Sequence, residues 1–167
     1  MGSLRDFVGQ ELQWMRTNVF KRIFELHAGE QCLATLQQSG LFRQVTVAES
    51  DGRRWRFKCQ GYLKVVPVIF EDAEEASTES APLASFKRQL RGGGGDLIFS
   101  DGHKYTWSCT GLLSLIWTMA GPEGTLFTLK KSRLLEIGPA ANNLPDLPLL
   151  VLFSLYLILR EEQEAGA

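Results

Sequence analysis

The stretch Leu147-Pro148-Leu149-Leu150-Val151-Leu152-Phe153-Ser154-Leu155-Tyr156-Leu157-Ile158-Leu159 decides how this chain folds. It has no polar stripe, so a helix formed from it is apolar on every side and must be surrounded by lipid or by protein. At about 1.5 Å per residue such a helix spans about 20 Å, less than the roughly 30 Å core of a bilayer. We therefore expect a helix at 146–160 that the rest of the chain encloses. A C-terminal membrane anchor is the alternative that this pattern leaves open.

Residues in and beside this run are compatible with a buried helix. Asp146 can cap its first turn, and Pro148 falls where a missing N–H costs little. Ser154 can donate a hydrogen bond to the carbonyl of Leu150. The Tyr156 hydroxyl needs a partner inside the protein or near its rim.

Short segments that alternate apolar and polar residues recur before the run and are separated by turn residues. This pattern is typical of strands in an antiparallel sheet. It predicts strands at 13–18, 20–26, 31–37, 42–48, 53–60, 64–70, 83–91, 95–100, 103–109, 113–119, 124–130 and 133–137.

The predicted organisation is one domain at 13–162 with short additions. A chain of 167 residues with 44% hydrophobic and 22% charged residues fits a single globular domain. Residues 1–12 are polar with scattered apolar positions and predict an N-terminal arm. The stretch 71–81 is rich in Glu, Ala, Ser and Thr and predicts a mobile acidic loop. Residues 163–167 are expected to form a tail.

A phrase beginning with Asp-Gly occurs twice, 50 residues apart. The segment 51–63 reads DGRRWRFKCQGYL and the segment 101–113 reads DGHKYTWSCTGLL. Asp-Gly is a strong hairpin signal because glycine supplies the positive φ that the turn needs. In both segments the aromatic residues and the cysteine share one strand face, which predicts equivalent places in two halves of the fold.

An apolar helix together with many strands favours a closed barrel over a two-sheet sandwich. A sandwich fills its interior with facing side chains and has no room for a helix, whereas a wide barrel has a lumen that must be filled. Eleven-stranded cans around a central helix exist. The expected fold class is mainly β: a twelve-stranded closed β-barrel around a central hydrophobic C-terminal α-helix.

The chain resembles the tubby C-terminal-like group, which includes tubby domains, phospholipid scramblases and LURP-one-related proteins. The resemblance covers about Gln13 to Arg160. It is carried by the twelve-strand rhythm, by the terminal apolar helix, and by the phrases 101–107 (DGHKYTW) and 121–126 (GPEGTL). It implies a barrel threaded by a hydrophobic helix. Tubby domains bind phosphoinositides and scramblases are tied to lipid movement and calcium, so the resemblance implies lipid as a partner without implying one secure activity.

The main candidate site is a basic strand. Arg54, Arg56 and Lys58 alternate with apolar residues, which places three cations on one face, and Lys64 extends the group. Tubby domains use a similar pattern of alternating cations for the lipid headgroup. The pattern predicts binding of anionic phospholipid or phosphoinositide headgroups, and the alternative is a solvated outer strand face. Lys130, Lys131 and Arg133 form a second basic cluster at a turn.

The sequence gives little support for a metal site, a catalytic site or nucleic-acid binding. His27 and His103 have no Cys or His partner at ligand spacing, so no metal and no cofactor are expected. The glycine run 92–95 is not followed by the Gly-Lys-Ser/Thr of a phosphate loop, and a Gly-x-Ser-x-Gly elbow is missing, so no catalytic residue is assigned. Aromatic residues do not interleave with the cations on the basic face, which argues against nucleic acid.

The expected function is therefore a non-catalytic binding domain, docking on anionic membrane lipids through the basic strand. A protein-interaction or scaffold domain for an unknown protein partner is the second hypothesis, and a C-terminally anchored membrane protein is the third. The three cysteines are odd in number and lie in apolar alternation. They predict free thiols and a cytoplasmic protein, with peripheral association at a membrane as an option.

Overall fold

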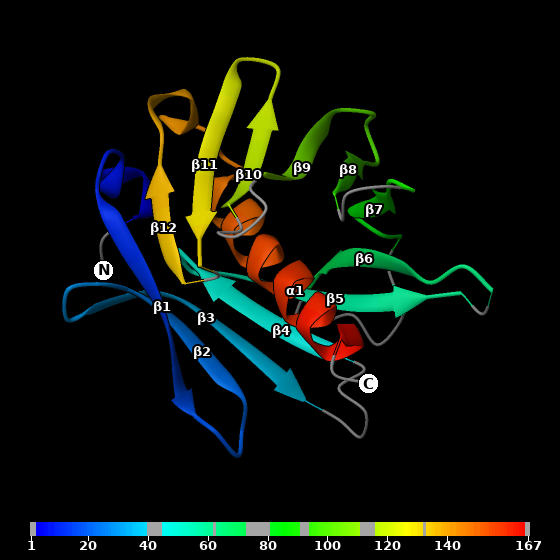
Figure 1. Cartoon of the computed structure of the whole chain (residues 1–167), viewed down its shortest axis with the longest axis horizontal. Helices are drawn as coiled ribbons and strands as arrows, with labels where there is room; N and C mark the ends of the chain where they lie inside the picture. Colours follow the sequence, from blue (N-terminus) through cyan, green and yellow to red (C-terminus); the bar gives the residue numbers. More distant parts are fainter. Residues whose placement is uncertain are drawn as a thin grey trace.

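A computed structural model describes residues 3–39, 45–61, 63–72, 81–90, 94–110, 116–131 and 133–165 of the chain. It is a closed antiparallel barrel in which every strand pairs with its neighbours in sequence and β12 closes on β1 (Figure 1). The strands are β1 (Glu11–Asn18), β2 (Ile23–Ala28), β3 (Gln31–Ser39), β4 (Val45–Ser50), β5 (Arg53–Gln60), β6 (Val66–Glu71), β7 (Ala84–Arg88), β8 (Gly95–Phe99), β9 (Lys104–Thr110), β10 (Ile116–Gly121), β11 (Gly124–Lys130) and β12 (Leu134–Ile137).

The predicted fold class is confirmed, and each predicted strand has an observed counterpart. The Asp-Gly pairs lie in the β4–β5 and β8–β9 connections, as their repeat predicts. The clearest boundary error is in β2, which starts at Ile23 rather than at 20. The chain between β1 and β2 makes a longer turn instead, in which the Lys21 N–H donates to Asn18 Oδ1 at 2.8 Å and Arg22 has a φ of 51°. The first part of the predicted strand 42–48 lies outside the described residues.

The helix α1 (Leu147–Ala165) fills the barrel. It runs through the ring of strands from the back of Figure 1 to the front. Its side chains from Leu149 to Leu159 are all at most 6% exposed. Phe153 packs against the rings of Phe57 and Phe86 at centroid distances of 5.2 and 6.0 Å. The predicted enclosure of the apolar run is therefore confirmed. None of the described helices is both long and apolar enough to cross a bilayer.

The helix is longer than its predicted span of 146–160 and takes in most of the predicted tail at 163–167. It continues to Ala165, and its side chains become partly exposed from Arg160 onward. An ion pair of 3.1 Å between Arg160 and Glu164, one helical turn apart, supports this last stretch. The C-terminal end of α1 is therefore not set by where its burial inside the barrel ends. Residues 166–167 lie outside the described part.

Polar groups of α1 find partners close to the predicted places. The Asp146 carbonyl accepts the Leu150 N–H at 2.9 Å, as an N-cap residue does, while the Asp146 carboxylate bonds to β9. Ser154 donates to the Val151 carbonyl at 2.7 Å and not to Leu150. The Tyr156 hydroxyl lies 3.2 Å from Cys59 Sγ, near the end of β5, which confirms a partner near the rim.

The N-terminal arm predicted at 1–12 is ordered, and it is shorter than expected. It contains a 3₁₀ helix, η1 (Leu4–Phe7), which Ser3 caps, and Leu4 is fully buried against the core. Glu11 and Leu12 already belong to β1. Of the predicted acidic loop at 71–81, Glu71 ends β6, and positions 73–80 lie outside the described residues. A second 3₁₀ turn, η3 (Pro139–Ala141), leads toward α1.

Connections of an antiparallel barrel alternate between its two ends. We call the end where α1 leaves the barrel the exit end; it carries the β1–β2, β5–β6, β7–β8 and β11–β12 connections. We call the opposite end, where α1 starts, the entry end; it carries the β2–β3, β4–β5, β6–β7, β8–β9 and β10–β11 connections. Contacts of Arg160 with Cys59, and of Asp146 with Tyr105, fix these directions.

Candidate functional site

The basic strand of the sequence analysis is β5, and its cations lie on the outer wall of the barrel. Trp55 and Phe57 are fully buried inside, while Arg54, Arg56 and Lys58 alternate with them and face outward. The predicted separation of charged and apolar faces is therefore confirmed. Its use for binding depends on what surrounds the cations.

Acidic side chains form ion pairs with Arg54 and Arg56. The Arg54 Nε lies 3.3 Å from a Glu49 oxygen and 3.0 Å from an Asp72 oxygen, and the Arg56 Nε lies 3.2 Å from the other Asp72 oxygen. Lys58 Nζ lies 5.6 Å from the centroid of the Phe70 ring. A lipid phosphate at Arg54 and Arg56 would compete with the Asp72 carboxylate that already bridges them.

Lys64, the fourth predicted site residue, lies apart from the other three. It is exposed in the β5–β6 connection at the exit end, next to Leu63. Lys64 therefore does not share the outer strand face of β5 with Arg54, Arg56 and Lys58.

Exposed apolar side chains concentrate at the exit end. Phe20 is 98% exposed in the β1–β2 connection, Leu63 is 105% exposed in the β5–β6 connection, and Leu90 is 104% exposed in the β7–β8 connection. Val19 and Val65 stand beside them, also exposed. Single exposed apolar residues are ordinary on protein surfaces, but three nearly complete exposures at one end of a barrel are not a random scatter.

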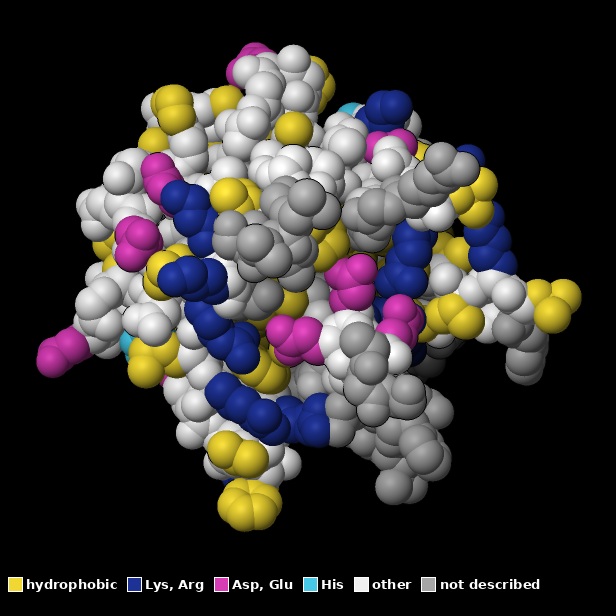
Figure 2. All heavy atoms as spheres, viewed as in Figure 1, with side chains coloured by type: hydrophobic (Ala, Val, Ile, Leu, Met, Phe, Trp, Pro, Cys, Tyr) yellow, Lys and Arg dark blue, Asp and Glu magenta, His cyan; other side chains and the backbone are white. Residues whose placement is uncertain are grey.

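Cations accompany these apolar residues at the same end. The basic residues of the described exit-end connections and adjoining strand ends are Arg16, Lys21, Arg22, Lys58, Lys64, Lys87, Arg88, Lys130, Lys131 and Arg133. Figure 2 shows Lys and Arg side chains as a column over the lower ends of β12, β1 and β2, with hydrophobic side chains at the projecting hairpin tips. Acidic side chains lie between this column and a second basic group near β6 and β7.

Two grooves open at the exit end. One of about 600 Å³ is lined by Leu63, Lys64, Lys87 and Leu90, among others. A smaller one, of about 220 Å³, is lined by the arginines at 16, 22 and 133. Both grooves also have apolar residues in their walls, and each includes one glutamate of α1, Glu164 in the larger and Glu162 in the smaller.

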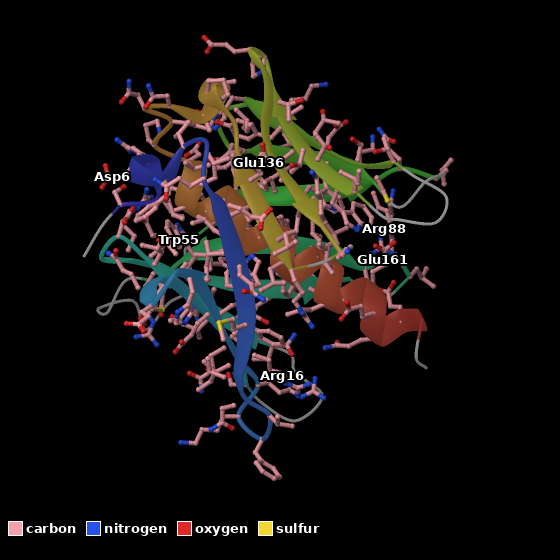
Figure 3. The ribbon with its side chains drawn as sticks, turned by 60° about the vertical axis from the view of Figure 1, so that its left-hand side comes forward. Asp6, Arg16, Trp55, Arg88, Glu136 and Glu161 are labelled. Carbon is pink, nitrogen blue, oxygen red and sulfur yellow. The ribbon has the colours of Figure 1, made fainter. Side chains whose placement is uncertain are left out.

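Neutral groups and the acidic end of α1 orient the arginines of this end. Arg16 donates to the Val19 carbonyl at 3.0 Å, and Arg22 donates to Gln38 Oε1 at 3.5 Å. Arg88 forms an ion pair with Glu164 at 3.2 Å. Figure 3 shows Arg88 and Glu161 together beside the end of α1, with Asp6 on the far side of the molecule.

The entry end has the opposite character. Acidic residues occupy its connections and the start of α1: Glu30, Asp51, Asp72, Asp101, Glu123 and Asp146. The Tyr105 hydroxyl donates to Asp146 at 2.8 Å, and His103 contacts Asp101 and also lies 3.1 Å from Asp146. Burial alone would lower the pKa of His103, but its hydrogen bonds and charge contacts with the two aspartates raise that pKa overall. Burial and Asp146 raise the pKa of Tyr105.

The sequence analysis missed the exit end as a single surface, although it noted Lys64 and the cluster at 130–133. The signal was present in two places, where an exposed apolar residue is followed directly by a cation, as in Phe20-Lys21 and Leu63-Lys64. Recognising it required the rule that alternate connections of a meander lie at one end of the barrel.

Comparisons of the chain with protein-family models, with curated proteins and with solved structures found no match. The resemblance to the tubby C-terminal-like group therefore stays a prediction.

Proposed function

We propose that this protein is a non-catalytic domain that docks the exit end of its barrel on an anionic membrane surface. The observation that carries the proposal is the pairing of Phe20, Leu63 and Leu90, each almost wholly exposed, with cations on the same connection or, for Leu90, at the adjoining end of β7. Membership in the tubby C-terminal-like group is part of the same proposal, because that resemblance implies a barrel around an apolar helix and a lipid partner.

The apolar residues and the cations of the exit end would contribute to membrane binding in different ways. Apolar side chains on separate connections insert into the boundary between headgroups and acyl chains, and binding strength grows with the apolar area that they bury there. Cations beside them remain at the level of the phosphates, where each Lys or Arg contributes about 1 kcal/mol near an anionic surface. Contact at several connections also fixes the barrel axis relative to the membrane.

The charge separation between the two ends supports one orientation. Acidic connections at the entry end are repelled by a negative leaflet, while Lys21, Lys64 and Lys131 at the exit end are exposed and attracted to it. The proposal keeps Lys64 from the sequence-predicted site. It replaces Arg54 and Arg56, whose charges are met by Glu49 and Asp72.

Vesicle sedimentation tests the proposal directly. The full chain is mixed with vesicles of phosphatidylcholine alone, with added phosphatidylserine, or with added phosphoinositide. We expect sedimentation with both anionic mixtures and little with the neutral one. If phosphoinositide greatly exceeds phosphatidylserine at matched charge, the headgroup itself is recognised. Absence of sedimentation with every anionic mixture contradicts the proposal.

Matched variants locate the surface. Lys21→Glu/Lys64→Glu/Lys131→Glu should lower vesicle binding at least about tenfold, because it reverses three charges at the membrane. Arg5→Glu/Arg53→Glu/Lys104→Glu, which reverses three exposed entry-end cations, is the charge control and should leave binding nearly unchanged. Equal losses in both variants would show a bulk charge effect and would overturn the assignment to the exit end.

A further inference from the structure

Three metal-ligating side chains of different kinds meet on the outer wall of the barrel, away from the exit-end surface. Glu25 and His27 stand two residues apart on β2 and so share a strand face. Cys32 lies on β3 directly opposite His27 in the antiparallel pairing. The nearest ligand atoms of the three side chains all lie within 4.8 Å of one another, and the His27 Nε2 is 2.7 Å from a Glu25 oxygen.

A β-bulge creates this arrangement. Pairing of β2 with β3 runs Glu25 to Thr35 and Leu26 to Ala34, and then shifts by one residue. Without the shift, His27 would face the buried Leu33; with it, His27 faces Cys32. Bulges commonly re-aim a side chain next to a functional site.

We propose that Glu25, His27 and Cys32 bind one zinc ion. Carboxylate, imidazole and thiolate are the three ligand types that zinc takes in proteins, at about 2.0–2.3 Å from the metal. Ligands at those distances in a tetrahedron stand roughly 3–4 Å apart, so small rotamer adjustments within the cluster suffice. On binding, the Cys32 thiol releases its proton to solvent and the neutral His27 offers a ring nitrogen.

Surroundings of the cluster agree with a three-ligand site. All three side chains are partly buried, so they have less conformational freedom to lose when they bind a metal. A groove of about 660 Å³ begins at Cys32 and runs along β3, β4 and β5. Water, or a ligand that enters by this groove, would complete the coordination as the fourth ligand. The spacing of the histidines in the sequence argued against a metal, because the ligand partner of His27 comes from across a hairpin.

Cobalt substitution is the sharpest test. Titration of the full chain with Co²⁺ should give one bound ion per chain, a thiolate-to-cobalt charge-transfer band in the near ultraviolet, and visible ligand-field bands of tetrahedral intensity. Addition of Zn²⁺ should displace the cobalt and remove these bands. Absence of the charge-transfer band at saturating Co²⁺ would overturn the proposal, whatever the variants do.

Variants within and outside the cluster complete the test. Cys32→Ser should abolish the charge-transfer band, and His27→Gln should weaken metal affinity at least about tenfold. Cys109→Ser and His103→Gln remove the same residue types elsewhere and should keep wild-type affinity. If a variant is unstable without metal, the wild type and the two outside variants still decide the question. Loss of the band in Cys109→Ser, or its persistence in Cys32→Ser, contradicts the assignment.

Discussion

At the scale of single residues, Asp72 decides what the basic strand can do. Its two carboxylate oxygens reach Arg54 and Arg56 on neighbouring outward positions of β5, at 3.0 and 3.2 Å. A cation with a carboxylate in contact offers little net charge to a distant anion. The outer face of β5 is therefore close to self-neutralised, although its sequence contains a run of cations.

A triple substitution on β5 tests this reading. Arg54→Ala/Arg56→Ala/Lys58→Ala should change binding to anionic vesicles by less than about twofold, because acidic partners already meet the charges of Arg54 and Arg56. The measurement is the same vesicle sedimentation, with the exit-end triple variant alongside. A loss as large as that of the exit-end variant would return the site to β5.

The pH dependence of stability should reveal the cluster around His103. Asp101 and Asp146 raise the His103 pKa in the folded protein. The contacts of protonated His103 with the two aspartates therefore stabilise the folded protein fully below the pKa of histidine in the unfolded chain, about 6.5. This contribution is lost as the pH rises through the higher pKa of His103 in the folded protein. His103→Gln should lower the melting temperature more at pH 5.5 than at pH 8.5. The effect should stay below about 1 kcal/mol, since 42% of the side chain is exposed. An effect of His103→Gln that does not vary with pH would contradict the assignment.

At the scale of elements, α1 is the core around which the strands close. Phe153 lies between β5 and β7 through its contacts with Phe57 and Phe86 and is fully buried. Phe153→Ala should therefore lower the free energy of unfolding by about 3–5 kcal/mol, the usual cost of removing a buried aromatic ring. Urea denaturation measures it. Glu162→Ala, on the exposed end of the same helix, should stay within about 0.5 kcal/mol of wild type. A similar small effect of Phe153→Ala would show that the ring is not packed as described.

Removal of the helix is the stronger perturbation of the same element. Truncation after Asn143 leaves the inward side chains of every strand without their packing partner. We expect an insoluble chain, or one that binds a hydrophobic dye and melts without cooperativity. A truncated chain that stays soluble and melts in one sharp transition would show that the barrel does not need its helix.

At the scale of the whole molecule, the described connections of the two barrel ends differ in charge: they carry cations at the exit end, beside the acidic end of α1, and acidic residues at the entry end. This difference predicts a salt dependence of membrane binding, because screening weakens attraction between exposed cations and phosphates. Vesicle binding should fall steeply between about 0.05 and 0.5 M salt and keep a remainder that salt does not remove. Phe20→Ser/Leu63→Ser/Leu90→Ser should remove that remainder, whereas Ile98→Ser on the barrel wall should keep it. Binding that does not respond to salt would contradict the proposed role of the cations.

The sequence by itself determined the architecture of this protein. The apolar run before Arg160 has no polar side, and the preceding segments alternate with period two, so local patterns were enough to predict a barrel around a helix. The turn at Asp51-Gly52 was equally local, because both residues adopt positive φ, at 52° and 74°. The end of α1 was not predicted, because the Arg160–Glu164 ion pair and exposed helix formers extend it beyond the buried part.

Only the tertiary structure decided which charged and ligating groups meet. Asp72, directly after β6, pairs with Arg54 on β5, and a bulge sets His27 against Cys32. The connections that carry Lys64 and Phe20 lie at the same end of the barrel. Electrostatics and ligation depend on distances of a few ångströms between atoms, and closure of the sheet brings together residues from separate strands. Hydrophobic periodicity is a property of each segment, so it can be recognised in the sequence. The ion pairs and ligand contacts between separate strands form only when the barrel has closed.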